Sequence, residues 1–520
     1  MMDAPLISYV FLALYIVAQS LYSLCFLLDF YLFRLPVNWV DMDEVKDLGP
    51  GDYPYIVLLY PVLRELESTM RTTFTSLAKI DYPRDRFQIV AVPNHNDHET
   101  IASLRRLQTE FPFIQLLIVP ATSDPSWNAI WAEWDRNEHV YWWHRGERAG
   151  DRNLPPKKTR QLIYAFYKLA EIWRGREDFL VNYIDADSCP PHDHFLAAAV
   201  GIKHYDVLQS QNIAGNLNAS MAATWHSADH MAWDGMKYPH LSADGKQPYW
   251  VLGKGLFYKA SDLLELGGFH PWITIEDPEV GMRFWANGKR LGIIQNPLIE
   301  EVPSTIKRGI IQRKRWVCGF FQSLDVPLRE LGMTRIQRFR AWTNFLPCLF
   351  LWVNAIGFPA GIWALWSYLS SEGILPGWTI WHSIFNLTAY AIFLTAFYRT
   401  TWKRTALVLG TRRERLWYML RINPISLMVW WVIWIIPLWL GYRMYREDSG
   451  LVWIPTVKID ANATLVRRQI AVGSLERLRL RANRPPPPPG VSRQRPGGPV
   501  TDLPGEVARR AKQSFARTGR

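Results

Sequence analysis

The sequence predicts an α/β, Rossmann-like domain joined to α-helical membrane spans. Two observations predict this class. From residue 53 onward, short apolar runs of strand length alternate with stretches of helical length, which is typical of a doubly wound sheet. Apolar runs long enough to cross a bilayer stand before and after this region. A chain of 520 residues is also long enough for two or more domains.

The charge balance bears on the partners of the protein. The formal net charge is +12, and residues 461–520 alone carry 13 basic and 3 acidic residues. The rest of the chain is therefore near neutral, which argues against nucleic acid as the main partner. The four cysteines are scattered without metal-ligand spacing and imply no disulfide framework.

The first segment, residues 1–34, contains an apolar run from 6 to 33 that is interrupted only by Asp29 and a few other polar residues. This run is too long for the core of a signal peptide, and the residues before it include an acid and no base. We therefore expect an uncleaved transmembrane helix. Arg34 follows it, which places the next part of the chain in the cytoplasm.

The second segment, residues 50–322, has the alternating pattern of a parallel sheet covered by helices. The predicted strands cover residues 55–60, 87–92, 114–119, 179–184 and 207–211. In such a sheet, ligands bind at the carboxyl ends of the strands.

Two acidic clusters fall where a ligand is expected. Asp185 and Asp187 directly follow a predicted strand, and alternating carboxylates there can bind a divalent cation together with diphosphate oxygens. Glu276 and Asp277 precede a predicted helix. A carboxylate there can take the proton from an acceptor hydroxyl that attacks an anomeric carbon. The alternative is that Asp277 and Glu279 only cap that helix.

A basic segment stands at the boundary between the domain and the apolar runs. Gln312, Arg313, Arg315 and Trp316 combine groups that bind phosphate bidentately with an indole that can stack on a sugar ring. The alternative is a juxtamembrane segment that anchors on anionic lipid. Earlier in the chain, Lys158 begins a predicted helix, where it can meet a pyrophosphate or be simply solvated.

The third part of the chain is apolar and basic. Residues 323–343 mix bases with apolar residues, which predicts a helix lying in the membrane interface. Three spans are predicted within residues 344–445, at 345–369, 378–398 and 424–440. The loop 399–421 is rich in bases, so the positive-inside rule places it in the cytoplasm with the domain.

The same rule creates a conflict at the basic tail, residues 446–520. One span before the domain and three after it would leave the tail outside, whereas its charge favours the inside. A further span, a re-entrant apolar segment or an exception to the rule would each resolve the conflict. The tail is rich in Pro, Arg and Gly and is expected to be disordered past about residue 480.

Several motifs in order resemble a known family. Over roughly residues 55–458, the chain resembles membrane-embedded family 2 glycosyltransferases of the cellulose, hyaluronan and curdlan synthase type. The matching residues are Tyr60-Pro61 to Glu65 as the first nucleotide-binding loop, Lys158 as the basic helix start, Asp185 and Asp187 as the D-x-D, Gly253 and Gly255 with Gly267 to Phe269, Ile275 to Asp277 at the T-E-D, and Gln312 to Trp316 as Q-x-x-R-W.

The resemblance implies a cytosolic catalytic domain of the GT-A fold that uses a nucleoside-diphosphate sugar with Mg²⁺ or Mn²⁺ and inverts the anomeric centre. By its motifs, Asp187 would be the main metal ligand, assisted by Asp185, and Asp277 would be the general base beside Glu276. The donor would be held by Pro61, Glu65, Asn94, Lys158, Asp185, Gln312, Arg313 and Arg315, and the acceptor by Trp316, Gly253 and Gly255.

Three departures from the family pattern matter. Pro93 and Asn94 stand where the family has paired acids that read uracil, so a UDP-sugar is expected but a GDP-sugar stays open. Ile275 replaces the usual Thr. With so few spans, export of a polymer would need a partner protein.

The leading hypothesis is therefore a metal-dependent, processive polysaccharide synthase. It would be a multi-pass protein of the bacterial inner membrane, with donor sugar, glycan acceptor and membrane lipid as partners. An export or regulatory partner is also expected. Two alternatives stay open: a transferase of single sugars to a lipid or short glycan, and a non-catalytic membrane scaffold whose tail recruits partners or anionic lipid.

Overall fold

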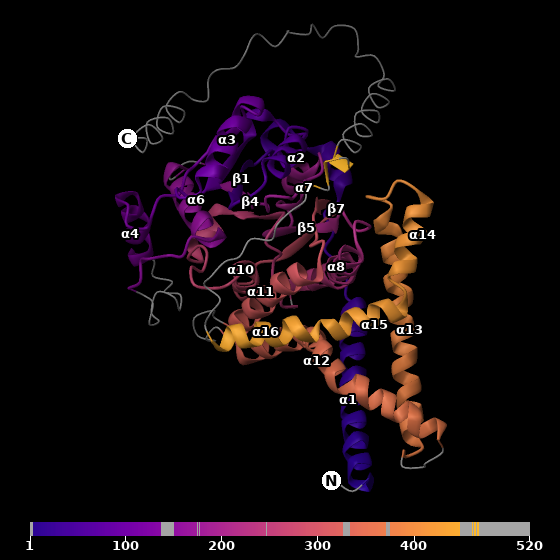
Figure 1. The fold of residues 1–520 in the computed structure, drawn as a ribbon. Helices are drawn as coiled ribbons and strands as arrows, with labels where there is room; N and C mark the ends of the chain where they lie inside the picture. The colour runs from indigo at the N-terminus through magenta and orange to yellow at the C-terminus, as the bar shows by residue number, and fades with distance from the viewer. Residues whose placement is uncertain are drawn as a thin grey trace.

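A computed structural model of the chain describes residues 4–136, 150–325 and 333–447, apart from 174, 176, 246 and 371–374, together with 460, 462–463 and 465–466. It shows an α/β domain from which three long helices project in one direction (Figure 1). Most of the predicted tail, residues 446–520, lies outside the described residues.

The domain is built on one seven-stranded mixed sheet of order β3-β2-β1-β4-β6-β5-β7. The strands are β1 Tyr55–Val62, β2 Phe87–Pro93, β3 Ile114–Leu116, β4 Phe179–Tyr183, β5 Val207–Ala214, β6 Leu256–Lys259 and β7 Leu291–Glu300. All neighbouring pairs are parallel except those of β6, which runs antiparallel to both β4 and β5. The sheet and its helices form the GT-A fold.

The reversed direction of β6 follows from the way the chain enters it. Gly255 donates its amide to the carbonyl of Tyr183 and accepts from the amide of Ser210, each at 2.9 Å. Its φ of +64° is one that glycine adopts readily. The strand therefore begins at the carboxyl end of β4 and runs back along it.

Helices cover both faces of the sheet, because alternate residues of the central strand point to opposite sides. Val57 and Leu59 join one apolar core and Ile56 and Leu58 the other. The first core is covered by α6 Lys158–Trp173 and α10 Asp277–Ala286, and the second by α2 Glu67–Leu77, α3 His98–Glu110 and α7 His194–Gly201. Among its described residues, the α/β domain also contains α4 Asn128–Arg136 and α9 Ala260–Glu265.

A further layer of helices separates the sheet from the projecting helices (Figure 1). It contains α8 Met221–Ala232, a π-helix over Trp233–Lys237, and α11 Ile306–Asp325. The pair α15 Pro424–Ile433 and α16 Ile435–Arg446 runs beneath this layer, and α16 packs along α11. A Cβ added to Gly441 would stand 2.6 Å from Cβ of Val317, which shows how closely the two helices approach.

This is a membrane protein. Among the described residues, four helices are long and apolar enough to span a bilayer: Leu6–Phe33, Phe350–Leu369, Trp378–Thr405 and Pro424–Arg446. They belong to α1 Ala4–Phe33, α12 Arg335–Leu369, α13 Trp378–Thr405 and the pair α15–α16. Helix α14 Arg412–Arg421 links α13 to α15 on the side of the α/β domain (Figure 1).

Within the described residues, the segment 323–343, predicted as a separate interfacial helix, is shared between two longer helices. Residues 323–325 end α11, and α12 runs without interruption from Arg335 through the predicted span to Leu369. A capping box sets the start of α12, since the Thr334 hydroxyl accepts from the Gln337 amide and the Gln337 side chain accepts in return from Thr334. A favourable start followed by apolar residues allows one long helix.

Buried polar contacts fix the projecting helices to the domain. The Arg404 guanidinium at the end of α13 donates to Oε1 of Gln211 at 2.7 Å and to the carbonyl of Asn212 at 2.6 Å. In α1, a carboxylate oxygen of Asp29 lies 2.6 Å from Nζ of Lys237 in the π-helix, and both side chains are nearly enclosed.

We expect Lys237→Met to lower the free energy of unfolding by about 3–5 kcal/mol, because it leaves Asp29 as a buried charge without its partner. The double variant Asp29→Asn, Lys237→Met removes both charges and should recover most of that loss. Thermal unfolding in detergent measures both. Equal destabilisation by the single and double variants would show that the ion pair does not determine the effect.

Candidate active site

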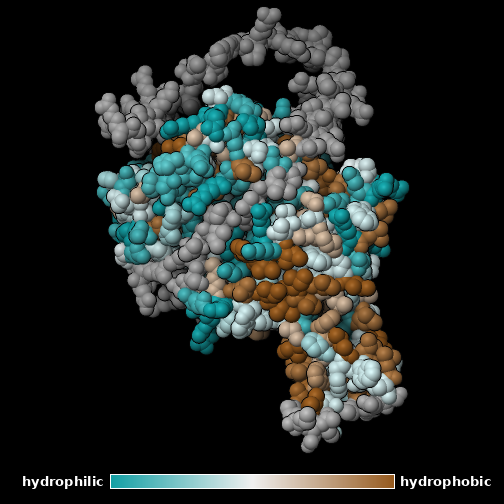
Figure 2. All heavy atoms as spheres, viewed as in Figure 1, coloured by the Kyte–Doolittle hydropathy of each residue, from teal (hydrophilic) through white to brown (hydrophobic). Residues whose placement is uncertain are grey.

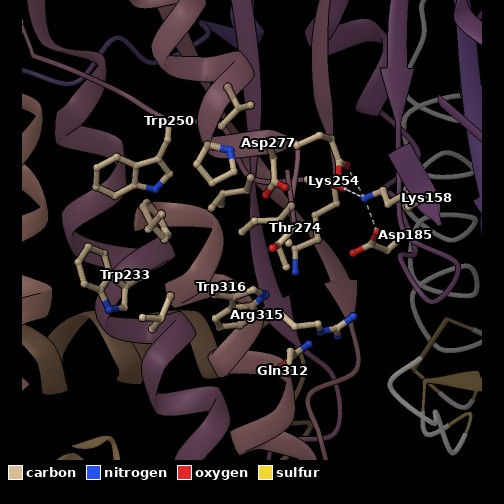
Figure 3. Close-up of a pocket in the computed structure, with 18 of the residues that line it drawn as sticks. Lys158, Asp185, Trp233, Trp250, Lys254, Thr274, Asp277, Gln312, Arg315 and Trp316 are labelled. Atoms are coloured by element: carbon tan, nitrogen blue, oxygen red, sulfur yellow. Dashed lines mark hydrogen bonds and ion pairs between the residues drawn. The ribbon is translucent and has the colours of Figure 1, made fainter. Parts of the chain in front are cut away.

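A cavity of about 290 Å³ opens at the carboxyl ends of β1 and β4, between the sheet and α11. Most of the residues predicted as a site line it, although they come from distant parts of the chain. They are Pro61, Glu65, Lys158, Asp185, Asp187, Gly253, Glu276, Asp277, Gln312, Arg315 and Trp316. Figure 3 shows two different walls: Lys158 and Asp185 lie on one side, and Trp233 and Trp250 on the other.

Lys158 is the cationic centre of the polar wall. It stands at the start of α6, and its Nζ donates to Oδ1 of Asp185 and to the carbonyl of Gly253, each at 2.7 Å. The same Nζ lies 3.5 Å from Oε1 of Glu276. Burial by itself would lower the pKa of Lys158, but the carboxylates of Asp185, Glu276 and Asp277 raise it above its ordinary value. The ammonium therefore stays charged and can balance further negative charge.

Asp277 occupies the first turn of α10, where Pro278 follows it. Burial, together with the neighbouring charge of Glu276, raises the pKa of Asp277 to about 7, and the ammonium of Lys158 opposes this rise. A carboxyl group that titrates near neutral pH is suited to accept a proton during a reaction. Glycine suits the position opposite it, because a Cβ at Gly253 would lie 3.1 Å from the Asp277 carboxylate and 3.2 Å from Nζ of Lys158, closer than most such contacts.

Asp185 and Asp187 follow β4 and reach the same cavity. The Asp185 side chain is 41 % exposed, whereas Asp187 is buried and accepts a hydrogen bond from the Glu301 amide at 2.9 Å. Carboxylate oxygens at a cavity wall are the ligands that Mg²⁺ and Mn²⁺ take. This donor set therefore fits a divalent cation.

The sequence analysis missed a second group with metal-ligand chemistry. His230, Asp234 and Glu300 bring ligand atoms within 4.8 Å of one another. Nδ1 of His230 lies 2.9 Å from Asp234 and 3.2 Å from Glu300. Lys254 also pairs with Glu300, so its ammonium already supplies positive charge there. The i, i+4 spacing of His230 and Asp234 was the only sequence signal.

Helix α11 divides its polar residues between two directions. Gln312, Arg315 and Trp316 line the cavity, since three and four residues make about one helical turn. Burial lowers the pKa of Arg315, while the charge of Asp185 opposes this shift. Asp185 and Arg315 thus act on each other electrostatically across the cavity.

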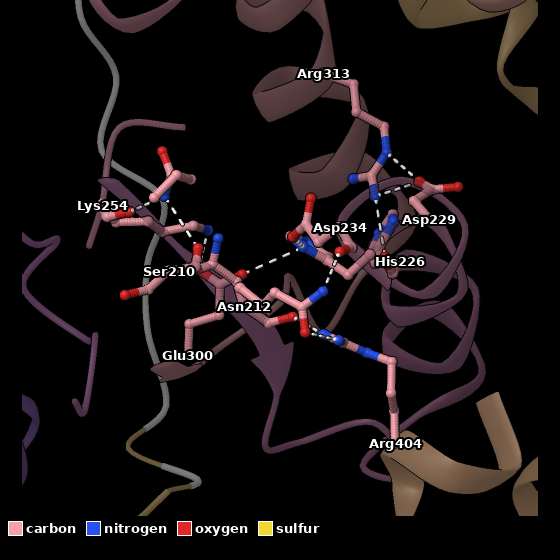
Figure 4. Close-up of polar contacts among 12 residues, drawn as sticks. Ser210, Asn212, His226, Asp229, Asp234, Lys254, Glu300, Arg313 and Arg404 are labelled. Carbon is pink, nitrogen blue, oxygen red and sulfur yellow. Dashed lines mark hydrogen bonds and ion pairs between the residues drawn. The ribbon is translucent and has the colours of Figure 1, made fainter. Parts of the chain in front are cut away.

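Arg313, which was predicted to hold a diphosphate, does not line the cavity. Arg313 is completely buried and donates to Oδ2 of Asp229 from Nε at 2.8 Å and from Nη2 at 2.5 Å (Figure 4). Asp229 also accepts from the indoles of Trp430 at 2.9 Å and Trp434 at 3.1 Å. Arg313 follows Gln312 by one residue, which turns its side chain about 100° around the helix axis and away from the cavity. It therefore joins α11 to α8 and, through Asp229, to Trp430 of α15.

Two further predicted binding residues do not line the cavity. Asn94 is fully buried, and its Oδ1 accepts from the Arg160 guanidinium at 3.1 and 2.6 Å. Desolvation lowers the pKa of Arg160 to about 10. This bond ties α6 to the end of β2 and engages the amide oxygen expected to read a base. Gly255 serves the chain reversal into β6.

The opposite wall of the cavity is apolar and was not predicted. It consists of Trp233, Trp250, Phe320, Phe345, Leu351, Trp434 and Leu438. Trp250 and Phe320 pack edge to face with ring centroids 5.0 Å apart. Phe345 and Leu351 come from α12, Trp434 from the junction of α15 and α16, and Leu438 from α16. The helices of the apolar region therefore complete the cavity.

Comparisons with known proteins place these features in context. The sequence profile of a family described as "Glycosyl transferase family group 2" matches residues 180–445. No curated protein gave a significant sequence match.

The chain is also similar to solved structures. A mannosyltransferase, PcManGT from Pyrobaculum calidifontis in complex with GDP-Man and Mn²⁺, is 16 % identical with a TM-score of 0.47, covering 84 % of this chain and 99 % of that one. S. aureus TarS 1-349 in complex with UDP-GlcNAc is 13 % identical with a TM-score of 0.33, covering 76 % of this chain and 92 % of that one.

Proposed function

Because this chain belongs to glycosyl transferase family group 2 and is a glycosyltransferase, we propose that it extends a polysaccharide from a nucleoside-diphosphate sugar, with inversion at the anomeric carbon. The subtype would be that of the cellulose, hyaluronan and curdlan synthases. One observation carries the proposal: Asp277, with a pKa near 7, shares a cavity with Asp185, Asp187, Lys158 and Arg315.

The polar wall suits the donor. Lys158 and Arg315 offer positive charge to the diphosphate, and Gln312 beside them offers a hydrogen-bonding amide. A bound Mg²⁺ or Mn²⁺, held mainly by Asp187 with Asp185, would supply further charge stabilisation to the departing diphosphate. Pro61 and Glu65 would border the nucleotide.

The reaction is a single displacement. The acceptor hydroxyl, on a sugar that rests on Trp316, would attack the anomeric carbon while the Asp277 carboxylate takes its proton. The new glycosidic bond forms as the bond from that carbon to the diphosphate oxygen breaks, and the nucleoside diphosphate leaves with the electron pair. Attack opposite the leaving group gives inversion. Glu276 would keep the proton affinity of Asp277 high.

A second candidate function is supported by the opposite wall. Phe320, Phe345, Leu351 and Leu438 present hydrocarbon rather than hydrogen-bonding groups to the cavity. An isoprenoid or acyl chain fits such a wall, so transfer of a sugar to a lipid-linked acceptor is the alternative. In both cases we propose a multi-pass protein of the bacterial inner membrane whose catalytic domain faces the cytoplasm. An export or regulatory partner is part of the polymer proposal.

We expect purified protein in lipid vesicles to incorporate label from a nucleotide sugar only with Mg²⁺ or Mn²⁺, and chelation to abolish the reaction. Screening UDP- and GDP-linked donors identifies the sugar. Asp187→Ala should reduce incorporation at least tenfold and raise the metal concentration needed. Asp262→Ala, on α9 and outside the lining of the cavity, is the matched control.

Product size separates the two candidate functions. A ladder or polymer that remains in the aqueous phase supports the synthase, whereas one added sugar extracted with organic solvent supports the lipid acceptor. No incorporation with any donor, from protein that folds normally, would contradict both.

A further inference from the structure

We propose that the fourth candidate span, Pro424–Arg446, does not cross the bilayer but lies along its surface on the side of the catalytic domain. One face of this α15–α16 pair would pack on the active-site helix α11. The other face would rest in the boundary between lipid headgroups and acyl chains. The inference goes beyond the proposed function and does not depend on it.

The direction of the helix pair is the first observation. In Figure 1, α1 and α13 project away from the domain, whereas α15 and α16 run across that direction directly beneath it. Figure 2 shows the same region as a hydrophobic band under the hydrophilic domain, continuous with the hydrophobic surface of the projecting helices. In a bilayer that encloses α1 and α13, the axes of α15 and α16 would therefore lie roughly parallel to the membrane plane.

The inner face of the α15–α16 pair packs against the α/β domain and contributes to the active-site cavity. Trp430 and Trp434 donate to the Asp229 carboxylate that holds Arg313. Trp434 and Leu438 line the active-site cavity, and Gly441 packs against α11. These contacts extend over most of the pair's length, so it cannot turn to cross the bilayer without opening the site.

The outer face of the pair is apolar and exposed. Its exposed side chains recur at helical spacing and are Ile425, Met428, Val429, Ile436 and Trp439. Ile425 is 71 % and Trp439 55 % exposed. Exposed apolar side chains that gather along one helix face mark a surface that meets another apolar phase. Lipid is the partner that fits, because this face continues the apolar surface of the spanning helices.

The charges favour the same arrangement. Seven basic residues precede the pair within residues 399–421, and Arg443 and Arg446 stand at its other end. The positive-inside rule therefore puts both ends on the catalytic side, where they can meet anionic headgroups. A helix that crosses would expose one basic end outside.

Three crossings then suffice: α1, α12 and α13. The start of α1, the end of α12 and the start of α13 lie at the same far end of the projecting helices (Figure 1). The basic tail returns to the catalytic side, which removes the conflict that four crossings create.

The side of the tail tests the proposal. Single cysteines replace Ala102 on α3, Gly377 before α13 and Ser474 in the tail, and a membrane-impermeant maleimide is applied to sealed vesicles of known orientation. All variants carry Cys348→Ser, and the chain with this change alone is the blank, since the other cysteines, Cys25, Cys189 and Cys318, are buried. We expect Ser474→Cys to be labelled from the same side as Ala102→Cys. Labelling of Ser474→Cys from the side of Gly377→Cys would overturn the proposal.

A photocrosslinking amino acid at Trp439 tests the lipid contact in the full-length protein, with Ala102 as the control position. Crosslinks to phospholipid at position 439 but not at 102 support the proposal. Crosslinks to another protein, or to a second copy of this chain, in place of lipid would show that this face is a protein interface and would contradict it.

Discussion

Asp277→Asn is expected to lower kcat roughly 10²–10⁴-fold, the usual contribution of a general base. The amide matches the carboxylate in shape but cannot accept the proton of the attacking hydroxyl. Binding of the donor should change much less, since the charges of Lys158 and Arg315 remain. Initial rates of sugar transfer and equilibrium binding of the nucleotide measure the two effects separately, and Asp262→Asn is the matched control.

The pH dependence of the native enzyme gives the same hypothesis a second readout. A base works only when deprotonated, and burial raises the pKa of Asp277 to about 7. The rate should therefore rise with pH through about 7 and level off above it, and Asp277→Asn should lose this rise. Equal rates for native enzyme and variant, or the same pH profile in both, would exclude Asp277 as the base.

Arg313→Met should destabilise the protein by about 3–5 kcal/mol, because it leaves the Asp229 carboxylate buried without its cation. Arg315→Met, two residues away, should unfold much like the native protein but raise the KM for the donor. The two variants together test whether Arg313 anchors α11 to the neighbouring helices while Arg315 binds the donor. Chemical or thermal unfolding measures the stability of each variant, and initial rates measure its KM for the donor.

The rescue variant sharpens this test. Asp229→Asn combined with Arg313→Met removes both charges, so it should recover much of the lost stability while transfer activity can remain impaired by altered packing of Trp430 and Trp434. If Arg313→Met folds normally and only weakens donor binding, then the anchoring role is wrong and Arg313 belongs to the donor site.

The strands and the acidic residues that follow them could be predicted because both depend on local patterns. The apolar run 179–184 ends where Asp185 begins, and parallel strands bring such ends to one edge. The antiparallel β6 could not be predicted in the same way. Its direction depends on long-range pairing of Gly255 with Tyr183 and Ser210.

The predicted site residues that do not line the cavity show a second limit. The segment 312–316 was interpreted as one phosphate-binding unit, yet helical phase turns Arg313 toward Asp229 and Arg315 toward the cavity. Asn94 was expected to bind the nucleobase of the donor, but its side-chain oxygen accepts a hydrogen bond from Arg160 of α6. The apolar wall depends on α12, α15 and α16 meeting the domain, which no local pattern reveals.

The most direct measurement of the central claim is the experimental structure of the protein with Mn²⁺ and a non-hydrolysable nucleotide sugar. We expect the ion against Asp187, the diphosphate between Lys158 and Arg315, and the anomeric carbon facing the space between Asp277 and Trp316. A donor bound away from this cavity, or bound in it with Asp277 remote from the anomeric carbon, would contradict the account.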